Sequence, residues 1–182
     1  EGVDFTGKRV AVIGTGSSGV QSIPVIARQA KHLTVFQRTA AYTVPARHHA
    51  ADLEFLDEVV KPNYDEILHK AKWSEGGFPV DHNERSALQV TAKERLETYE
   101  TLWSGGGFAF EWGSFRDTLK DRRANDTVAE FIRSKIRELV EDPETTEKLL
   151  PTDHPWGSKR ALIDTNYFET YNRDNVELVD IR

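Results

Sequence analysis

Three glycines near the start of the chain have the spacing of a phosphate-binding turn. They are Gly14, Gly16 and Gly19, and Thr15, Ser17 and Ser18 stand between them. In such a turn the first glycine permits a tight bend, the second lets the backbone approach a pyrophosphate, and the third lets a helix pack closely on a strand. The N–H groups that open the helix, together with the helix dipole, attract negative charge. The spacing therefore predicts a site for a dinucleotide.

The residues around these glycines predict the elements that such a site requires. Residues 10–13 form an apolar, β-branched run typical of a buried parallel strand, and residues 20–30 have the composition of a helix. A second apolar run over residues 33–36 predicts the next strand. Because the glycines follow a strand and open a helix, we interpret them as a dinucleotide-binding motif rather than as a tight turn alone.

The residues after the second strand indicate which dinucleotide binds. A site for NAD commonly has an acidic residue about 20 positions beyond the glycines, where it accepts hydrogen bonds from the ribose 2′-hydroxyl. This chain has Gln37, Arg38 and Thr39 there. Arg38 would find no partner in an unphosphorylated ribose, but a 2′-phosphate would accept charge-assisted hydrogen bonds from its guanidinium. We therefore predict NADP(H), with a solvated charge at a strand end as the alternative for Arg38.

The composition excludes some classes of partner. The chain has 182 residues and a net charge of −6, which argues against nucleic acid or an anionic membrane as its main partner. No apolar run approaches the roughly 20 residues of a membrane span. The absence of cysteine excludes disulfides and thiolate metal ligands and favours a cytoplasmic location. The adjacent His48 and His49 lack the neighbours of a metal site, so no metal is predicted.

The order of the patterns predicts an α/β fold: a Rossmann-like NAD(P)-binding domain with a parallel sheet and a mostly helical insertion. Residues 1–47 and 151–182 form the NADP-binding part, and residues 48–150 form the insertion. Residues 176–180 should add a third strand to the sheet. Since doubly wound domains usually have about five or six strands, we expect the sheet to be incomplete and the chain to be part of a longer protein.

Local signals predict where some of the other segments begin and turn. Residues 42–47 should be extended and leave the sheet. Thr91 and Glu94 have the spacing of a capping box, which predicts the start of a helix. Asn125 is expected to cap the most clearly amphipathic helix of the insertion.

Taken together, these residues resemble the NADPH domain of flavin-dependent Baeyer–Villiger monooxygenases, of the cyclohexanone, phenylacetone and steroid monooxygenase types. The resemblance extends over essentially the whole chain. It is carried by residues 14–21, 35–39, 158–160 and 172–176, and by the insertion around residues 105–108, 115 and 125–136.

The resemblance implies roles for individual residues toward the cofactor. The glycines and Thr15 would form the turn, and Ser17, Ser18 and Gln21 would contact the pyrophosphate region of NADP. Arg38, Thr39 and Lys159 would hold the 2′-phosphate. From the residues alone, Lys159 and Arg160 are only a basic pair in a loop, and such pairs are often solvated.

The resemblance also implies a reaction and a catalytic residue. In the family, NADPH reduces FAD, the reduced flavin takes up O₂, and a ketone is converted to an ester or lactone. Arg160 would be the active-site arginine beside the flavin and the nicotinamide. Its guanidinium stays charged at any working pH, so it can stabilise a negatively charged oxygen without the transfer of a proton. Only one glycine motif is present, so the FAD-binding domain is expected before residue 1 in the same polypeptide.

Two other functions are compatible with the residues. The chain could be the NADPH domain of another flavoprotein monooxygenase, of the N-hydroxylating or flavin-containing type. It could also be a non-catalytic module that senses NADP(H). The identity of a ketone substrate and the oligomeric state do not follow from this sequence.

Overall fold

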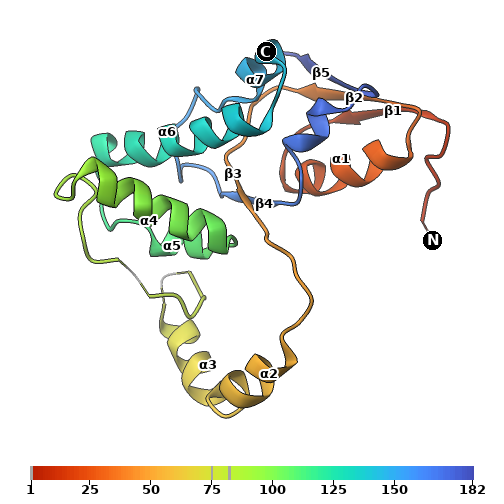
Figure 1. The fold of residues 1–182 in the computed structure, drawn as a ribbon. Helices are drawn as coiled ribbons and strands as arrows, with labels where there is room; N and C mark the ends of the chain where they lie inside the picture. Colours follow the sequence, from red (N-terminus) through yellow and green to blue (C-terminus); the bar gives the residue numbers. More distant parts are fainter. Residues whose placement is uncertain (1, 75, 82) are drawn as a thin grey trace.

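The computed structural model describes residues 2–74, 76–81 and 83–182 (Figure 1). Residue 1 of the predicted NADP-binding part and residues 75 and 82 of the predicted insertion lie outside this description. The division of the chain into these two parts stays a prediction.

The three predicted strands form one parallel sheet. They are β1 (Arg9–Ile13), β2 (His32–Gln37) and β5 (Val176–Asp180), in the order β1-β2-β5. Helix α1 (Ser17–Gln29) connects β1 to β2, as expected for a strand–helix–strand unit. The carboxyl ends of the strands lie at one edge, because Ile13 pairs with Phe36 and Phe36 pairs with Val179. The prediction of a parallel sheet is confirmed.

The prediction that the first strand is buried is wrong. Within the described residues β1 is an edge strand that pairs only with β2, and its side chains alternate between half-buried and exposed. The side chain of Ile13 is 82% exposed, whereas Leu33 and Val35 of β2 are completely buried. An apolar run can form either kind of strand, because burial depends on what packs against it.

A second, two-stranded parallel sheet joins segments far apart in the sequence. It consists of β3 (Thr43–Pro45) and β4 (Leu162–Asp164). Residues 42–47 leave the first sheet as predicted, but their pairing with β4 was not foreseen. This pairing brings β3, which precedes the helical segments, next to β4, which follows them.

Helices occupy most of the chain between β3 and β4. They are α2 (Leu53–Phe55), the π-helical η1 (Leu56–Val60), α3 (Tyr64–Trp73), α4 (Ala92–Gly105), α5 (Ala109–Gly113), α6 (Arg122–Leu139) and α7 (Pro143–Leu149). A 3₁₀ helix, η2 (Glu169–Asn172), precedes β5. The capping box of α4 is confirmed: Glu94 N donates to the Thr91 hydroxyl, and Thr91 N donates to the Glu94 carboxylate.

Asn125 does not cap a helix, so this prediction is wrong. Helix α6 begins one turn earlier, where Asp121 accepts a hydrogen bond from Arg123 N at 2.8 Å. Asn125 is buried inside the helix, and its Nδ2 donates to the carbonyl oxygens of Thr118 and Trp156, both at 2.8 Å. Its Oδ1 accepts from Trp156 N at 3.1 Å. Asn125 therefore ties α6 to the loop that contains Lys159 and Arg160.

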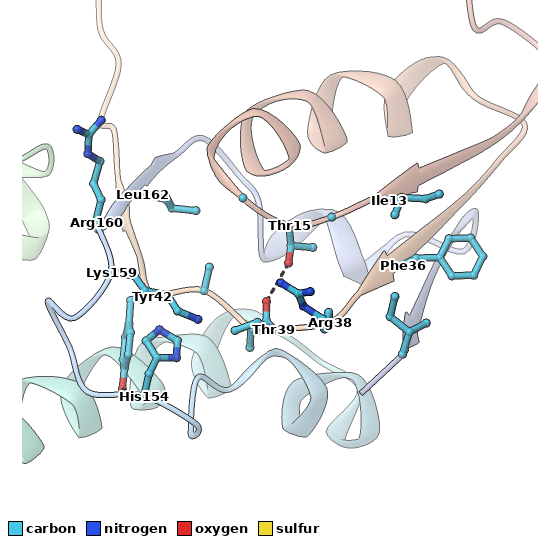
Figure 2. A pocket seen from close by; sticks show the side chains of 15 residues that line it. Ile13, Thr15, Phe36, Arg38, Thr39, Tyr42, His154, Lys159, Arg160 and Leu162 are labelled. Carbon is cyan, nitrogen blue, oxygen red and sulfur yellow. Dashed lines mark hydrogen bonds between the residues drawn. The ribbon is translucent and has the colours of Figure 1, made fainter.

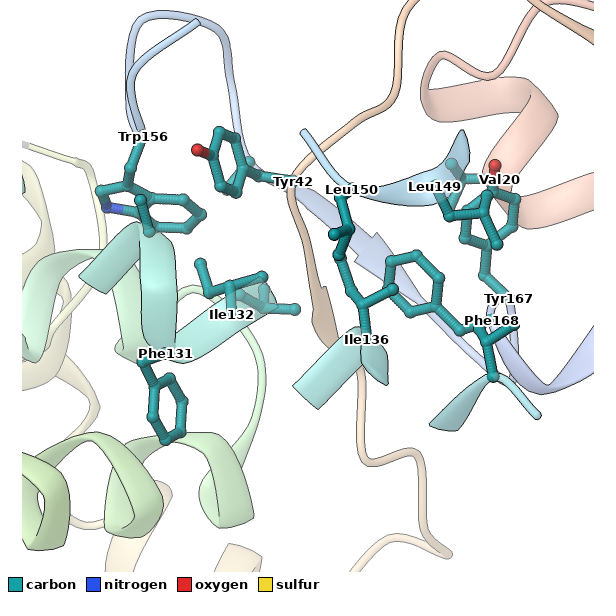
Figure 3. Close-up of a cluster of buried hydrophobic side chains, with 14 of the residues drawn as sticks. Val20, Tyr42, Phe131, Ile132, Ile136, Leu149, Leu150, Trp156, Tyr167 and Phe168 are labelled. Carbon is teal, nitrogen blue, oxygen red and sulfur yellow. The ribbon is translucent and has the colours of Figure 1, made fainter. Parts of the chain in front are cut away.

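One hydrophobic cluster runs through the sheet, α1 and the later helices. It includes two residues of α1, Val20 and Ile23, and two of β2, Leu33 and Val35. Helix α6 and several aromatic residues complete it: Phe131, Ile132, Ile136, Tyr42, Phe110, Trp156, Tyr167 and Phe168 (Figure 3). Burying one large apolar side chain stabilises a fold by about 1.5–3 kcal/mol. The segments on both sides of the insertion and helix α6 thus share a core.

Two further observations concern membranes and metals. Among the described residues, no helix combines the length and the apolar character needed to cross a bilayer. In the same part of the chain, no three histidine, aspartate or glutamate side chains come together as a metal site.

Candidate dinucleotide-binding cleft

A cleft of about 620 Å³ lies at the carboxyl ends of the parallel strands (Figure 2). Open α/β sheets bind nucleotides at this edge, outside the ends of their strands. The lining comes from the glycine-rich turn, the segment after β2, the loop before β4 and the residue after β5. It consists of Ile13, Gly14, Thr15, Gly16, Phe36, Arg38, Thr39, Ala40, Ala41, Tyr42, His154, Lys159, Arg160, Leu162 and Ile181.

The glycines of the turn have distinct structural reasons. Gly14 has a φ of +98°, which favours glycine, and a Cβ at Gly19 would lie 2.3 Å from the Gly14 carbonyl oxygen. Gly19 is therefore required for the close approach of α1 to the turn, as predicted. Gly16 lines the cleft, and a Cβ there would meet no protein atom within 4 Å. No contact within the described protein explains a glycine at position 16, whereas a ligand in the cleft would.

The N-terminus of α1 suits an anion. The helix begins at Ser17, and Gly16, which precedes it, offers no side-chain cap. The first turn also contains no acidic residue. Its N–H groups therefore have no side-chain acceptor among the described residues, and the helix dipole adds a partial positive charge at the same place.

Arg38 stands exposed at the end of β2, after a firmly held residue. Gln37 is buried, and its Nε2 donates to the Lys148 carbonyl at 2.7 Å. The main-chain carbonyl of Gln37 accepts from Ile181 N at 2.9 Å. Arg38 itself has neither a hydrogen bond nor an ion pair within the part of the chain that the structure describes. A free guanidinium in a cleft is available for a ligand anion.

Lys159 and Arg160 reach the cleft from the loop before β4. The loop is anchored by the buried Trp156 and by Ser158, whose hydroxyl donates to the Pro155 carbonyl at 2.8 Å. Both cations are exposed, and the described residues give neither of them a hydrogen bond or a salt bridge. Figure 2 shows the Lys159 side chain directed toward the centre of the cleft and the Arg160 side chain directed away from it.

The pKa values of two carboxyl groups near the cleft, Asp153 and Glu111, are shifted. The pKa of Asp153 is lowered by the hydrogen bond from His154, with a smaller contribution from the charge of Lys159. Burial raises the pKa of Glu111, and the positive charge of Arg160 opposes part of that rise. Arg160 therefore acts electrostatically on α5 but has no close carboxylate partner there.

Not every predicted residue lies in the cleft. Ser17, Ser18 and Gly19 do not line it, although they follow directly on Gly16. Gln21 lines a separate hollow of about 490 Å³, together with Arg28 and Arg173. The roles assigned to Ser17, Ser18 and Gln21 toward a cofactor stay predictions.

Sequence reasoning did not predict several cleft residues, among them Tyr42 and His154. Tyr42 and His154 pack edge to face, with ring centroids 5.2 Å apart, and the Tyr42 hydroxyl donates to the His154 carbonyl at 3.3 Å. Arg133 of α6 donates to the Tyr42 hydroxyl at 3.1 Å. No local pattern identifies either residue, because their relation depends on the β3–β4 pairing and on α6.

The chain is similar in sequence to several monooxygenases. It is 45% identical over 183 residues to a Baeyer–Villiger monooxygenase of Pseudooceanicola batsensis and 44% identical over 181 residues to a cyclohexanone 1,2-monooxygenase of Acinetobacter. A phenazine N-monooxygenase of Lysobacter antibioticus is 43% identical over 180 residues. These matches include 98–100% of this chain, which spans about one third of each relative. No family model matches the chain.

Solved structures give the same result for the fold. A steroid monooxygenase bound to NADP matches all of this chain with a TM-score of 0.92 and 51% identity. The complex of OTEMO with FAD and NADP matches it with a TM-score of 0.96 and 46% identity, and in both cases the chain covers 34% of the other protein. By sequence over its whole length and by fold, the chain is thus similar to about one third of the length of Baeyer–Villiger monooxygenases.

Proposed function

We propose that this chain binds NADP(H) in the cleft and serves as the NADPH-binding part of an FAD-dependent monooxygenase that inserts one oxygen atom of O₂ into a ketone. The product would be an ester or a lactone. The observation that carries the proposal is the grouping of Arg38, Lys159 and Arg160, without salt bridges among the described residues, in one cleft with the glycine-rich turn. Dinucleotide phosphates match both the cations and the turn.

The residues present fit NADP(H). The open space beside Gly16 and the N–H groups at the start of α1 suit a pyrophosphate. Arg38 and Lys159 would hold the 2′-phosphate, with Thr39 beside them. The guanidinium of Arg38 keeps its charge at any working pH, so its side of the contact does not depend on a proton.

Arg160 would serve the chemical step. NADPH, when bound, supplies the hydride that reduces the flavin. Arg160 diverges from Lys159, so one residue can face the ribose phosphate while the other faces the reacting centre (Figure 2). Its guanidinium keeps its charge at any working pH and can stabilise negative charge that develops on oxygen.

The rest of the polypeptide would hold FAD and most of the ketone site. Two observations support this: the chain spans about one third of its relatives, and it covers 34% of OTEMO, which was solved in complex with FAD and NADP. The similarity to a phenazine N-monooxygenase favours oxygenation of a nitrogen atom as the second candidate function. A cytoplasmic location, expected from the absence of cysteine, stays a prediction.

Titration calorimetry with NADP⁺ and NAD⁺ tests the cofactor site. A charge-assisted hydrogen bond contributes about 1.5–3 kcal/mol, so Arg38→Ala should weaken NADP⁺ binding roughly ten- to a hundredfold and leave NAD⁺ binding nearly unchanged. Arg28→Ala is the matched control, since Arg28 is an exposed arginine outside the cleft. Equal losses for both cofactors in Arg38→Ala would mean that Arg38 has a structural role instead.

Kinetics of the FAD-loaded enzyme separates the two cations of the loop. Lys159→Ala should raise the KM for NADPH and change kcat little, because it removes binding shared by ground and transition states. Arg160→Ala should abolish ester formation, followed by chromatography of the product. If Arg160→Ala still formed ester at the wild-type rate, both residues would belong to a phosphate clamp. An oxidised nitrogen in place of an ester would support the second candidate function.

A further inference from the structure

Thr15 links the two sides of the cleft. It stands between Gly14 and Gly16, but its side chain turns inward and the residue is only 5% exposed. Its hydroxyl donates a hydrogen bond of 3.0 Å to the carbonyl oxygen of Thr39, 24 residues away (Figure 2). Thr39 follows Arg38 directly, so this bond connects the glycine-rich turn to the segment proposed to hold the 2′-phosphate.

The hydroxyl of Thr15 lies close to the buried Tyr167. Tyr167 is 1% exposed, and the Tyr171 hydroxyl donates to the Tyr167 hydroxyl at 2.9 Å. Burial raises the pKa of Tyr167, and the nearby Thr15 hydroxyl opposes part of that rise. The main-chain N–H of Tyr167 donates to Asp164 of β4 at 3.3 Å. Tyr167 is therefore held by tertiary contacts beside Thr15. At this buried place water does not compete for the hydrogen bond of the Thr15 hydroxyl.

The segment that Thr15 holds has few other hydrogen bonds, although Ala40 within it is buried. Residues 38–41 lie between Gln37, whose carbonyl accepts from Ile181 N, and Tyr42, whose carbonyl accepts from Leu162 N. Among the described residues, the bond from Thr15 is the only hydrogen bond to the backbone of residues 38–41. Its loss would leave the backbone of Arg38 and Thr39 without a hydrogen bond among the described residues, while the glycine-rich turn kept its own geometry.

We propose that Thr15 is a positioning residue for cofactor selectivity: its hydroxyl sets the place of Arg38 and Thr39 and thereby favours NADP(H) over NAD(H). The inference rests on the proposed function. The effect should appear in the ratio of the two affinities. The phosphate contacts proposed for Arg38 and Thr39 depend on this segment, whereas the contacts common to both cofactors depend on the backbone of the turn.

Calorimetry on Thr15→Val and Thr15→Ser tests the inference. Valine keeps the shape and removes the donor, so NADP⁺ binding should weaken about three- to tenfold, the range expected for one neutral hydrogen bond, while NAD⁺ binding changes less than about twofold. Serine keeps the donor and should retain the wild-type ratio. If Thr15→Val does not fold, as judged by circular dichroism, Thr15→Ala removes the same donor with less bulk and should give the same ratio.

The outcomes also separate this inference from the proposed function. Equal losses for both cofactors, no loss in the variants without a hydroxyl, or a loss in Thr15→Ser as large as in Thr15→Val would overturn the inference. If Arg38→Ala removes the preference for NADP⁺ but Thr15→Val retains it, the cofactor site stands and the inference fails. If the wild-type protein does not prefer NADP⁺, the cofactor assignment fails first.

Discussion

Helix α6 and the helical hairpin α2–η1–α3 are both parts of the predicted insertion, yet they differ in what surrounds them. Seven residues of α6 are buried: Ala124, Asn125, Val128, Ala129, Phe131, Ile132 and Ile136. The hairpin has no buried residue in any of its three segments. Several of its large apolar side chains are exposed, among them Phe55, Tyr64, Leu68 and Trp73. Figure 1 shows the hairpin far from both sheets.

The difference shows that helical periodicity alone does not make a helix part of a core. α6 shares its core with Tyr42, which lines the cleft, and with Trp156, which packs against Tyr42, so its packing supports the proposed cofactor site. The hairpin depends on its own hydrogen bonds and on exposed ion pairs such as Lys61–Asp57. Short helices without tertiary packing are marginally stable in water, so the hairpin should open before the rest of the fold.

The largest expected loss of stability comes from a residue that packs against α6. Phe110 is completely buried and packs against Phe131 of α6 and against Trp156. Phe110→Ala should lower the free energy of unfolding by about 3–5 kcal/mol, because it removes a large apolar side chain and leaves a cavity. Urea unfolding followed by circular dichroism measures the loss. A loss below about 1 kcal/mol would show that this cluster does not hold the insertion on the fold.

The next effect concerns the buried amide of α6. Asn125→Ala would leave the carbonyls of Thr118 and Trp156 and the N–H of Trp156 without their partner. Unpaired buried groups are costly, so we expect a loss of about 2–4 kcal/mol in urea unfolding. Asn63→Ala in the hairpin is the matched control, because the exposed side chain of Asn63 donates, among the described residues, to the Val59 carbonyl alone. Similar losses in the two variants would contradict the comparison.

A third prediction concerns how the free energy of unfolding depends on pH through Asp164, a buried residue of β4. Burial raises the pKa of Asp164, and the hydrogen bond from the Thr43 hydroxyl opposes part of that rise. The native state then binds the proton more tightly than the unfolded state, whose carboxyl has a pKa of about 3.9. Stability from this group is therefore fully present below that pH and is lost as the pH rises through the native value.

Asp164→Asn removes this titration. The difference in unfolding free energy between the variant and the wild type should shift in favour of the variant as the pH rises from about 4 to 7. Urea unfolding at several pH values provides the measurement. A difference that stays constant with pH would mean that the carboxyl titrates alike in the folded and unfolded states.

The smallest expected effect is in the hairpin. Phe55→Ala makes the same chemical change as Phe110→Ala, but Phe55 is 54% exposed in α2. The change in unfolding free energy should stay within about 0.5 kcal/mol. A loss comparable to that of Phe110→Ala would show that the hairpin packs against another surface in the protein used for the measurement.

The sequence by itself determined the features that depend on neighbouring residues. The turn at Gly14 and the close approach at Gly19 follow from backbone sterics within one strand–turn–helix unit. The capping box at Thr91 and the three strands of the main sheet likewise follow from short patterns. Arg38 lines the same cleft as the turn, because the connection through α1 fixes the position of β2 next to β1.

The tertiary structure alone decided the features that join distant segments. The β3–β4 pairing, the buried role of Asn125 and the contact of Tyr42 with His154 all connect residues separated by long stretches of chain. Lys159 was assigned to the cofactor only through resemblance, and the fold is what brings it into the cleft with Arg38. Short patterns record local conformational preference, whereas such contacts depend on which of many distant surfaces pack together in the folded chain.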